Sequence, residues 1–393
     1  MLDFTYHIPT KVVFGRNSLN ALASLIREAG ATHVLVHFGG QSAVKSGLID
    51  KVKAQLEEAG VRYTLLGGVA PNPKVSLARE GVALCKREGV DFILAVGGGS
   101  VIDSAKCIAL GAKMEEDVWN IFERKVRPSE ALPIGSVLTI AAAGSEMAGG
   151  LVISNDELGL KRDYGTPALR PVFCIENPEL TYTVSKWQTA CGTVDILMHT
   201  FERYFTPTED VDFTDELCEG LCRSVIKAGS IAYENPTDYE ARATLMWASS
   251  LSQNDLMGMG RRADWATHQL EHDLSGMYDN VSHGAGLAVI FPAWCRYVMK
   301  HNIARFCRFA EKVWGISGEG LTQQQHAEKG VEAAQAYFVS LGMPKDLKAF
   351  GVDPDRLPEM AEKCSFNGQR TLGGLHTLNT EDMLHIYRLA YGD

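Results

Sequence analysis

The sequence predicts an α/β domain with a parallel sheet over residues 1–184 and an all-helical domain over residues 185–393. At 393 residues the chain is too long for one ordinary hydrophobic core, so two domains are expected. In the first half, short apolar runs of strand composition alternate with helical periodicity and are joined by glycine turns. This alternation is typical of a parallel sheet covered by helices. After residue 184 helical periodicity dominates.

The first half is expected to open with a β-hairpin over residues 5–14, turning at Pro9 and Thr10. The elements that follow are predicted as helices over 18–28, 42–59, 75–88 and 100–110, and as strands over 33–38, 63–66, 91–96 and 172–175. Ligands of such a sheet bind at the carboxyl ends of its strands.

The second half is predicted to contain helices only, bounded by capping residues, glycines and prolines. They are expected over 186–205, 212–233, 238–257, 265–274, 286–300, 302–314, 323–341, 354–364 and 380–391.

Composition excludes several classes of protein. The net charge of -10 argues against nucleic acid or an anionic membrane surface as a partner. No apolar run approaches the length of a membrane span, and the N-terminus lacks a signal pattern, so a cytoplasmic location is expected. The nine cysteines, an odd number without close pairing, indicate reduced thiols.

A glycine run ends the predicted strand 91–96 and opens the next helix. It reads Gly97-Gly98-Gly99-Ser100, with Asp103 one turn later. Its backbone amides and the helix dipole suit a pyrophosphate, although a tight turn alone would also explain the glycines. The sequence therefore favours a dinucleotide-binding domain.

The end of the first predicted strand bears on the choice of dinucleotide. An Asp or Glu there would bind the ribose diol and repel a 2′-phosphate, but the residues are Gly39, Gly40, Gln41 and Ser42. The Ser42 hydroxyl and Lys45, one turn further, suit a 2′-phosphate instead. NADP(H) is therefore the predicted cofactor.

A set of polar residues in the helical half has the spacing of metal ligands. Asp195 and His199 are four residues apart and project from one helix face, and His268 and His272 repeat that spacing. His283 follows a polar turn and opens another apolar segment. Any one histidine at helical spacing is usually structural, but Asp195, His199, His268 and His283 together form a four-ligand set for one divalent metal. The second domain is thus predicted to be an all-α C-terminal metal-binding domain.

These motifs together resemble the iron-dependent (group III) alcohol dehydrogenases, and within them the butanol-dehydrogenase-like, NADP-preferring aldehyde reductases. The resemblance covers essentially the whole chain. It implies Fe²⁺ as the favoured ion, with Zn²⁺ as the alternative, since carboxylate and imidazole accept both. It also places His272 near the nicotinamide, in a catalytic proton-relay or positioning role; a supporting contact to His268 is the other interpretation.

The resemblance adds expected cofactor contacts. A second loop, residues 139–146, is similar to the family's Thr/Gly/Ser cofactor loop, although Ala143 stands where relatives often have threonine. A solvated side chain is the alternative interpretation of Lys161. The additional cofactor contacts that the resemblance implies are Asn72, Thr139, Gly144, Ser145, Lys161 and Thr183.

The expected reaction is hydride transfer between NADP(H) and a small primary alcohol or aldehyde, with the metal polarising the substrate oxygen. A lyase or cyclase of the dehydroquinate-synthase type is the rival enzyme, but it needs many polar groups for an anionic substrate. The segment from Met246 to Met259 is mostly apolar, although Arg261 and Arg262 follow it. A ligand-binding relative without activity is the other rival.

A homodimer is expected, formed through the predicted hairpin over residues 5–14. An exposed hairpin edge tends to find a partner, and pairing with its copy across a two-fold axis would satisfy it. The alternative is that the segment joins the edge of its own sheet; relatives that dimerise favour the first interpretation.

Overall fold

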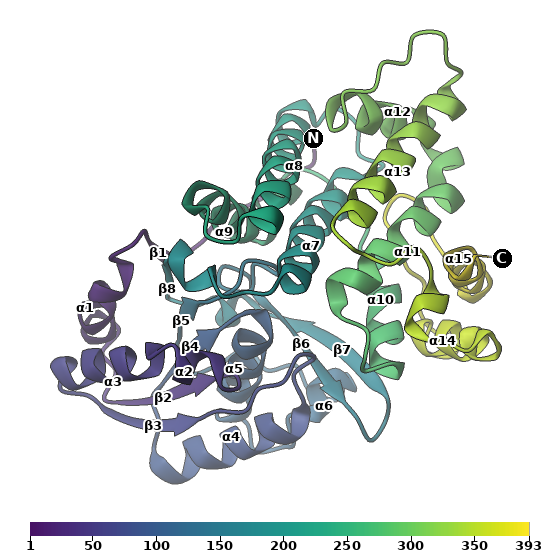
Figure 1. Cartoon of the computed structure of the whole chain (residues 1–393). Helices are drawn as coiled ribbons and strands as arrows, with labels where there is room; N and C mark the ends of the chain where they lie inside the picture. Colours follow the sequence, from purple (N-terminus) through teal and green to yellow (C-terminus); the bar gives the residue numbers. More distant parts are fainter. Residues whose placement is uncertain (393) are drawn as a thin grey trace. The chain divides into compact units, whose positions relative to one another are not determined.

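The computed structural model describes residues 1–392 and divides into two compact units (Figure 1). The sheet unit comprises His7–Val184 and Ser249–Asn254; the helical unit comprises Met1–Tyr6, Ser185–Ala248 and the chain from Asp255 onward. Asp393, where the predicted helical domain ends, lies outside the described residues. The chain thus leaves the sheet unit at Val184 and returns to it once, for six residues at the end of one long helix.

The sheet unit contains the predicted parallel sheet, whose six strands run in the order β1-β8-β5-β4-β2-β3. Every neighbouring pair is parallel. Its strands are β1 (Lys11–Phe14), β2 (His33–Phe38), β3 (Arg62–Leu66), β4 (Phe92–Gly97), β5 (Ile134–Leu138) and β8 (Phe173–Glu176). Its main helices are α1 (Leu22–Glu28), α2 (Ser42–Lys45), α3 (Leu48–Ala59), α4 (Val75–Glu88), α5 (Gly99–Gly111) and α6 (Trp119–Phe122).

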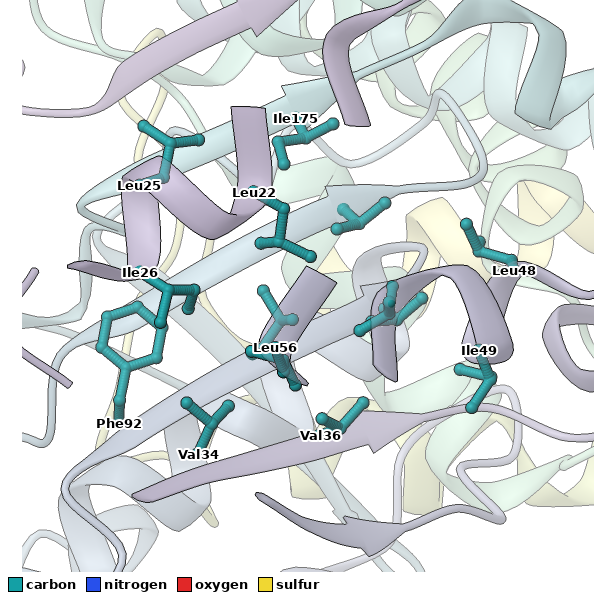
Figure 2. Packing of buried hydrophobic residues seen from close by; sticks show 14 of the residues in the cluster. Leu22, Leu25, Ile26, Val34, Val36, Leu48, Ile49, Leu56, Phe92 and Ile175 are labelled. Atoms are coloured by element: carbon teal, nitrogen blue, oxygen red, sulfur yellow. The ribbon is translucent and has the colours of Figure 1, made fainter. Parts of the chain in front are cut away.

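The two faces of β2 show why this sheet forms. Val34 and Val36 point into the apolar cluster beneath α1 and α3, where Leu22, Ile26 and Leu56 pack against them (Figure 2). On the opposite face the ring of His37 is buried against Ser104 of α5. Burial on both faces explains the continuous apolar runs of the central strands.

The predicted hairpin over residues 5–14 is wrong. Within the described chain, residues 1–10 form no strand, and β1 pairs in parallel with β8 at the sheet edge. The Thr10 hydroxyl donates a hydrogen bond to Pro171 O at 2.7 Å, which ties this segment to the strand beside it. Joining the edge of its own sheet, the alternative interpretation, is what residues 11–14 do.

The sheet unit also contains a small antiparallel pair of strands that was not predicted from the sequence. The strands β6 (Gly150–Asn155) and β7 (Leu160–Gly165) form a separate two-stranded sheet. Three consecutive charged residues interrupt β7, which reads Leu-Lys-Arg-Asp-Tyr-Gly, so it shows neither an apolar run nor an alternating pattern. Lys161, predicted near the cofactor, lies on this strand.

The helical unit has the predicted all-α character. Its main helices are α7 (Lys186–Tyr204), α8 (Asp212–Glu234), α9 (Tyr239–Gln253), α10 (Ala266–Met277), α11 (His283–Val298), α12 (Ile303–Lys312), α13 (Gln323–Ser340), α14 (Leu357–Cys364) and α15 (Thr380–Tyr391). Helix α11 begins at His283 rather than at the predicted Gly286, so the histidine stands at a helix start. None of the helices in residues 1–392 has the length and apolar composition that crossing a bilayer requires.

Candidate functional site

Three helices bring the predicted metal ligands together. Helix α7 carries Asp195 and His199 one turn apart, α10 carries His268 in its first turn, and α11 begins with His283. Asp195 Oδ1 lies 3.4 Å from His199 Nδ1, 3.7 Å from His268 Nε2 and 3.7 Å from His283 Nε2. The four residues therefore converge on one carboxylate oxygen, although their role as ligands stays a prediction.

The atoms at this point of convergence fit a metal ion. Asp195 Oδ1, His199 Nδ1 and His268 Nε2 are buried, and none has a hydrogen-bond partner within the described residues. Leaving such atoms unpaired costs about 1–3 kcal/mol each, so an occupant with positive charge would relieve a substantial penalty. The candidate ligand atoms of these three residues lie within 4.8 Å of one another.

Two buried glutamates orient the histidines, and sequence reasoning missed both. Glu202 contacts His268 Nδ1 and also accepts from the His268 backbone N–H at 3.1 Å. Glu271 contacts His283 Nδ1 through one carboxylate oxygen. A carboxylate that binds Nδ1–H leaves the Nε2 lone pair available to a metal. The overlooked signal was spacing, because each glutamate follows a candidate ligand by three residues on an apolar helix face.

The charges of this cluster perturb its titration. Burial lowers the pKa of His268, but the carboxylates of Glu202 and Asp195 outweigh burial and raise it to about 9. Burial drives the pKa of His199 well below its ordinary value. Burial raises the pKa of Asp195, but the histidines outweigh burial and lower it overall. Metal binding to such a cluster releases protons, because a ligating imidazole must be neutral.

His272 borders the cluster. Its ring centroid lies 6.4 Å from that of His268 and 5.6 Å from that of His283. It also belongs to a second group of candidate ligand atoms, with Glu271 and His283. His272 therefore lies beside His268 and His283, and its role as a proton relay or as a support of His268 stays a prediction.

Trp265 is a further residue that the sequence did not single out. It precedes α10 in the left-handed region, with φ of 67°, which is unusual for a bulky side chain. Its ring meets those of His199 and His268 edge-on, with centroids 6.1 and 5.4 Å away. The Arg203 guanidinium lies over it at 4.5 Å. Trp265 thus packs on two of the candidate ligands and restricts their orientation.

The glycine loop in the sheet unit has the expected strand-to-helix placement. Strand β4 ends at Gly97 and α5 begins at Gly99. A Cβ at Gly98 would overlap the Ile140 side chain, and one at Gly97 would overlap Val101. Glycine is therefore required for close packing here. The N–H groups of Val101 and Ile102 donate to Gly98 O, so the amides that the start of α5 can offer to an anion are those of Gly99 and Ser100.

The second predicted loop begins directly beside the first. Thr139 follows β5, and its backbone N–H donates to Gly97 O at 3.1 Å. Gly144 adopts φ of +63°, and its N–H donates to the Ser249 hydroxyl at 3.2 Å. The two loops are thus adjacent at the carboxyl ends of β4 and β5, where ligands of parallel sheets bind.

Asp103 and Ser145 hold this loop to α5. The Ser145 hydroxyl donates to Asp103 Oδ1 at 2.6 Å, and the Val152 N–H donates to Asp103 Oδ2 at 2.9 Å. Lys106, fully buried, donates to both Ser145 oxygens at 2.8 Å. Asp103, predicted as a cofactor contact, is therefore engaged on both oxygens in positioning the loop.

The remaining predicted cofactor residues lie on other segments of this unit. Gly39 and Gly40 follow β2, and Ser42 opens the short helix α2. Lys161 is buried and donates to Asn72 Oδ1 at 3.0 Å, so its interpretation as a solvated lysine is wrong. Thr183 is exposed just before α7.

Comparison with known proteins gives a consistent result over the chain. Residues 9–178 match the family model of the iron-containing alcohol dehydrogenases, and residues 189–391 match the C-terminal model of that family. The probable NADH-dependent butanol dehydrogenase 1 of Bacillus subtilis (strain 168) is 42% identical over 390 residues, spanning 99% of this chain and 100% of that protein. The NADPH-dependent aldehyde reductase YqhD of Escherichia coli (strain K12) is 34% identical, spanning 99% and 100%.

A solved structure agrees with these matches. The crystal structure of NADH-dependent butanol dehydrogenase A from Thermotoga maritima has a TM-score of 0.95 to this chain at 39% identity, with 99% of each chain covered. The matching family models and relatives are alcohol dehydrogenases and an aldehyde reductase, which makes the chain an oxidoreductase. The chain belongs to the iron-containing alcohol dehydrogenase family. These matches do not favour the rival lyase of the dehydroquinate-synthase type.

A pair of histidine variants tests the assignment of ligands. His268→Ala removes an atom that faces Asp195 Oδ1, so bound metal should fall at least about tenfold. His272→Ala is the matched control on the same helix, one turn away, and should retain its metal while losing rate. Elemental analysis after anaerobic purification measures both. Full metal content in His268→Ala would contradict the site, and metal loss in His272→Ala would move His272 among the ligands.

Proposed function

We propose that this chain catalyses reversible hydride transfer between NADP(H) and a small primary alcohol or its aldehyde, of the size of butanol and butyraldehyde. The observation that carries the proposal is the convergence of Asp195, His199, His268 and His283 at one oxygen, with buried ligand atoms unpaired within residues 1–392. The names of the relatives, butanol dehydrogenases and an aldehyde reductase, support the substrate class. Fe²⁺ is the proposed ion, with Zn²⁺ as the alternative.

The helical unit would hold the metal through those four residues. A divalent ion bound there would supply Lewis-acid polarisation of the substrate oxygen. Glu202 and Glu271 keep the Nε2 atoms of His268 and His283 directed at Asp195 by binding the opposite ring nitrogens. His272, beside this cluster, is proposed to deliver a proton to the substrate oxygen during aldehyde reduction and to remove it during alcohol oxidation.

The sheet unit would hold the dinucleotide. The first turn of α5, behind Gly97, Gly98 and Gly99, offers amides to the pyrophosphate. The adjacent loop from Thr139 to Ser145 and the Asn72–Lys161 pair are proposed as further contacts. Within this proposal Asp103 acts through Ser145, because both of its oxygens already accept hydrogen bonds.

The preference for NADP(H) rests on the end of β2. Residues 39–42 include no acidic side chain that would bind the ribose diol, while Ser42 and Lys45 are exposed on α2. A 2′-phosphate would gain a hydroxyl and a cation there. The relatives are mixed, since the Bacillus protein is named NADH-dependent and the Escherichia coli protein NADPH-dependent. The proposal therefore depends on the residues themselves.

Steady-state kinetics with butyraldehyde test both parts of this proposal. Protein reconstituted anaerobically with Fe²⁺ or Zn²⁺ should oxidise NADPH only when metal and aldehyde are both present. The kcat/KM for NADPH should exceed that for NADH. Gly39→Asp should lower the NADPH/NADH ratio at least about tenfold, because a carboxylate repels the 2′-phosphate.

Gly39→Asn is the matched control, since it adds the same volume without the charge. Equal ratios for the Asp and Asn variants would refute the placement of the 2′-phosphate. A wild-type ratio in favour of NADH would refute the NADP(H) preference. Absence of aldehyde-dependent turnover with either metal would refute the reaction itself.

The proposed assembly is a homodimer formed through the N-terminal segment. Met1, Leu2, Phe4 and Tyr6, which belong to the helical unit, are 54, 52, 54 and 41% exposed and form a run of apolar side chains. Exposed apolar side chains that follow one another in this way tend to be covered by another chain. A second copy related by a two-fold axis would cover both segments at once.

Deletion of residues 1–6 tests the dimer. Light scattering should give the mass of a dimer for the full chain and of a folded monomer for the shortened one. Circular dichroism checks that the shortened protein keeps its helices. A shortened protein that is folded and still dimeric would rule out this segment as the main interface.

A further inference from the structure

The chain returns to the sheet unit at Ser249–Asn254, and this return places a hydroxyl between two buried carboxyl groups. Ser250 Oγ lies 2.6 Å from Glu146 Oε1 and 2.7 Å from Glu176 Oε1. Glu146 ends the predicted cofactor loop, and Glu176 is the last residue of β8. All three side chains are buried, with 1% exposure for Glu146 and none for Ser250 and Glu176.

The two contacts of Ser250 Oγ need two hydrogens, one more than the serine hydroxyl supplies. A serine hydroxyl has one hydrogen and can donate it to only one of the two oxygens. The other contact, at 2.6 or 2.7 Å, therefore requires a carboxylic acid that donates to Ser250 Oγ. Glu176 Oε2 has no hydrogen-bond partner within the described residues, which suits a neutral acid better than a carboxylate.

The charges around Glu146 and Glu176 also favour a proton on Glu176 and a negative charge on Glu146. Burial raises the pKa of Glu146 as well, but a hydrogen bond from Ser250 and the charge of Lys106 of α5 oppose that rise, and Lys106 gives Glu176 no such support. Burial, followed by the charge of Glu146, raises the pKa of Glu176 to about 8. The other titratable groups that face the pair are Cys174 on β8, whose thiol pKa is raised by burial, and Asp103 beyond Lys106. Burial also lowers the pKa of Lys106, to about 8.

The neighbouring residue connects the carboxyl pair to the loop. The Ser249 hydroxyl accepts from the N–H groups of Ala142 and Gly144, both at 3.2 Å. A Cβ at Gly144 would overlap Ser249 O, so loop and segment are in direct backbone contact. Moving Ser250 therefore moves the segment that fixes the middle of the loop.

We propose that Glu176 is a carboxylic acid that positions the loop from Thr139 to Glu146 through Ser250, so that affinity for the nicotinamide cofactor falls when this proton is lost. The inference rests on the proposed cofactor role of that loop. Glu176 is a positioning residue here, because it acts through Ser250 and Glu146.

The direction of the pH effect follows from the proton. When Glu176 ionises, its proton passes to solvent. Glu146 and Glu176 are then both carboxylates, which repel each other, and the single hydrogen of Ser250 can bind only one of them. Because the pKa of Glu176 is raised, this residue is protonated and holds the loop well below about pH 8, and it loses the proton above that pH. If only the protonated form binds cofactor, the apparent Kd rises about tenfold between about pH 7 and about pH 9.

Fluorescence titration of the metal-loaded protein with NADPH over this pH range tests the proposal. Glu176→Gln should abolish the alkaline rise in Kd, because its amide N–H₂ donates to Ser250 without a titratable proton. Ser250→Ala should weaken binding at every pH. Glu115→Gln, at an exposed site of the same unit, should behave as wild type. An unchanged alkaline rise in Glu176→Gln would overturn the proposal and assign the titration to another group such as Lys106.

Infrared spectroscopy in the absence of cofactor separates this inference from the proposed function. At neutral pH the wild type should show a protonated-carboxyl carbonyl band that is missing from Glu176→Gln and that fades as the pH rises through about 8. Absence of that band from the difference spectrum would overturn the shared proton. Failure of the wild type to bind NADPH or NADH at any pH would instead overturn the proposed cofactor loop, and with it the link from Glu176 to cofactor affinity.

Discussion

The helical unit is organised around buried negative charge at and near Asp195. Asp195, Glu202 and Glu271 place three carboxyl groups in its interior, with exposures of 4, 0 and 0%. Three imidazoles converge on one oxygen of Asp195, and Glu202 and Glu271 bind the far sides of two of them. Protons on histidines balance this charge only in part, because burial opposes protonation of His199. A divalent cation would satisfy the unpaired ligand atoms and the excess negative charge together.

The convergence requires helices that hold their positions. Phe201 on α7 stacks on Phe291 of α11 with ring centroids 5.2 Å apart, and Phe205 packs against Trp294 of α11 at 5.6 Å. Phe309 of α12 meets Phe201 edge-on at 5.0 Å. This aromatic cluster fixes α7 against α11, and so fixes Asp195 relative to His283. Dense packing transmits any change in one helix to the other, which makes the spacing of the ligands sensitive to distant core residues.

Features with a local sequence signature were predictable. Continuous apolar strands, such as residues 33–38, and helical periodicity gave the parallel sheet and the helical unit. The spacing of Asp195 to His199 and of His268 to His272 marked the cluster. The roles of Glu202 and Glu271 were not predictable in this way, because their partners lie on other helices, and neither was the contact of Ser250 with Glu146, 104 residues earlier. The hairpin over residues 5–14 failed for the same reason: β-strand composition is local, but the partner strand β8 is more than 150 residues away.

Metal-dependent stabilisation tests the central claim most directly, namely that the buried cluster is built to hold a divalent cation. Chelator-treated protein should gain about 5–10 °C in the unfolding midpoint of the helical unit when Fe²⁺ or Zn²⁺ is added at about a hundred times its Kd. Glu332→Gln, an exposed carboxylate-to-amide change on α13, should show the same gain. Asp195→Asn, the equivalent change at the convergence, should lose most of it. A wild type that gains nothing from either metal, or an Asp195→Asn variant that gains as much as wild type, would contradict the account.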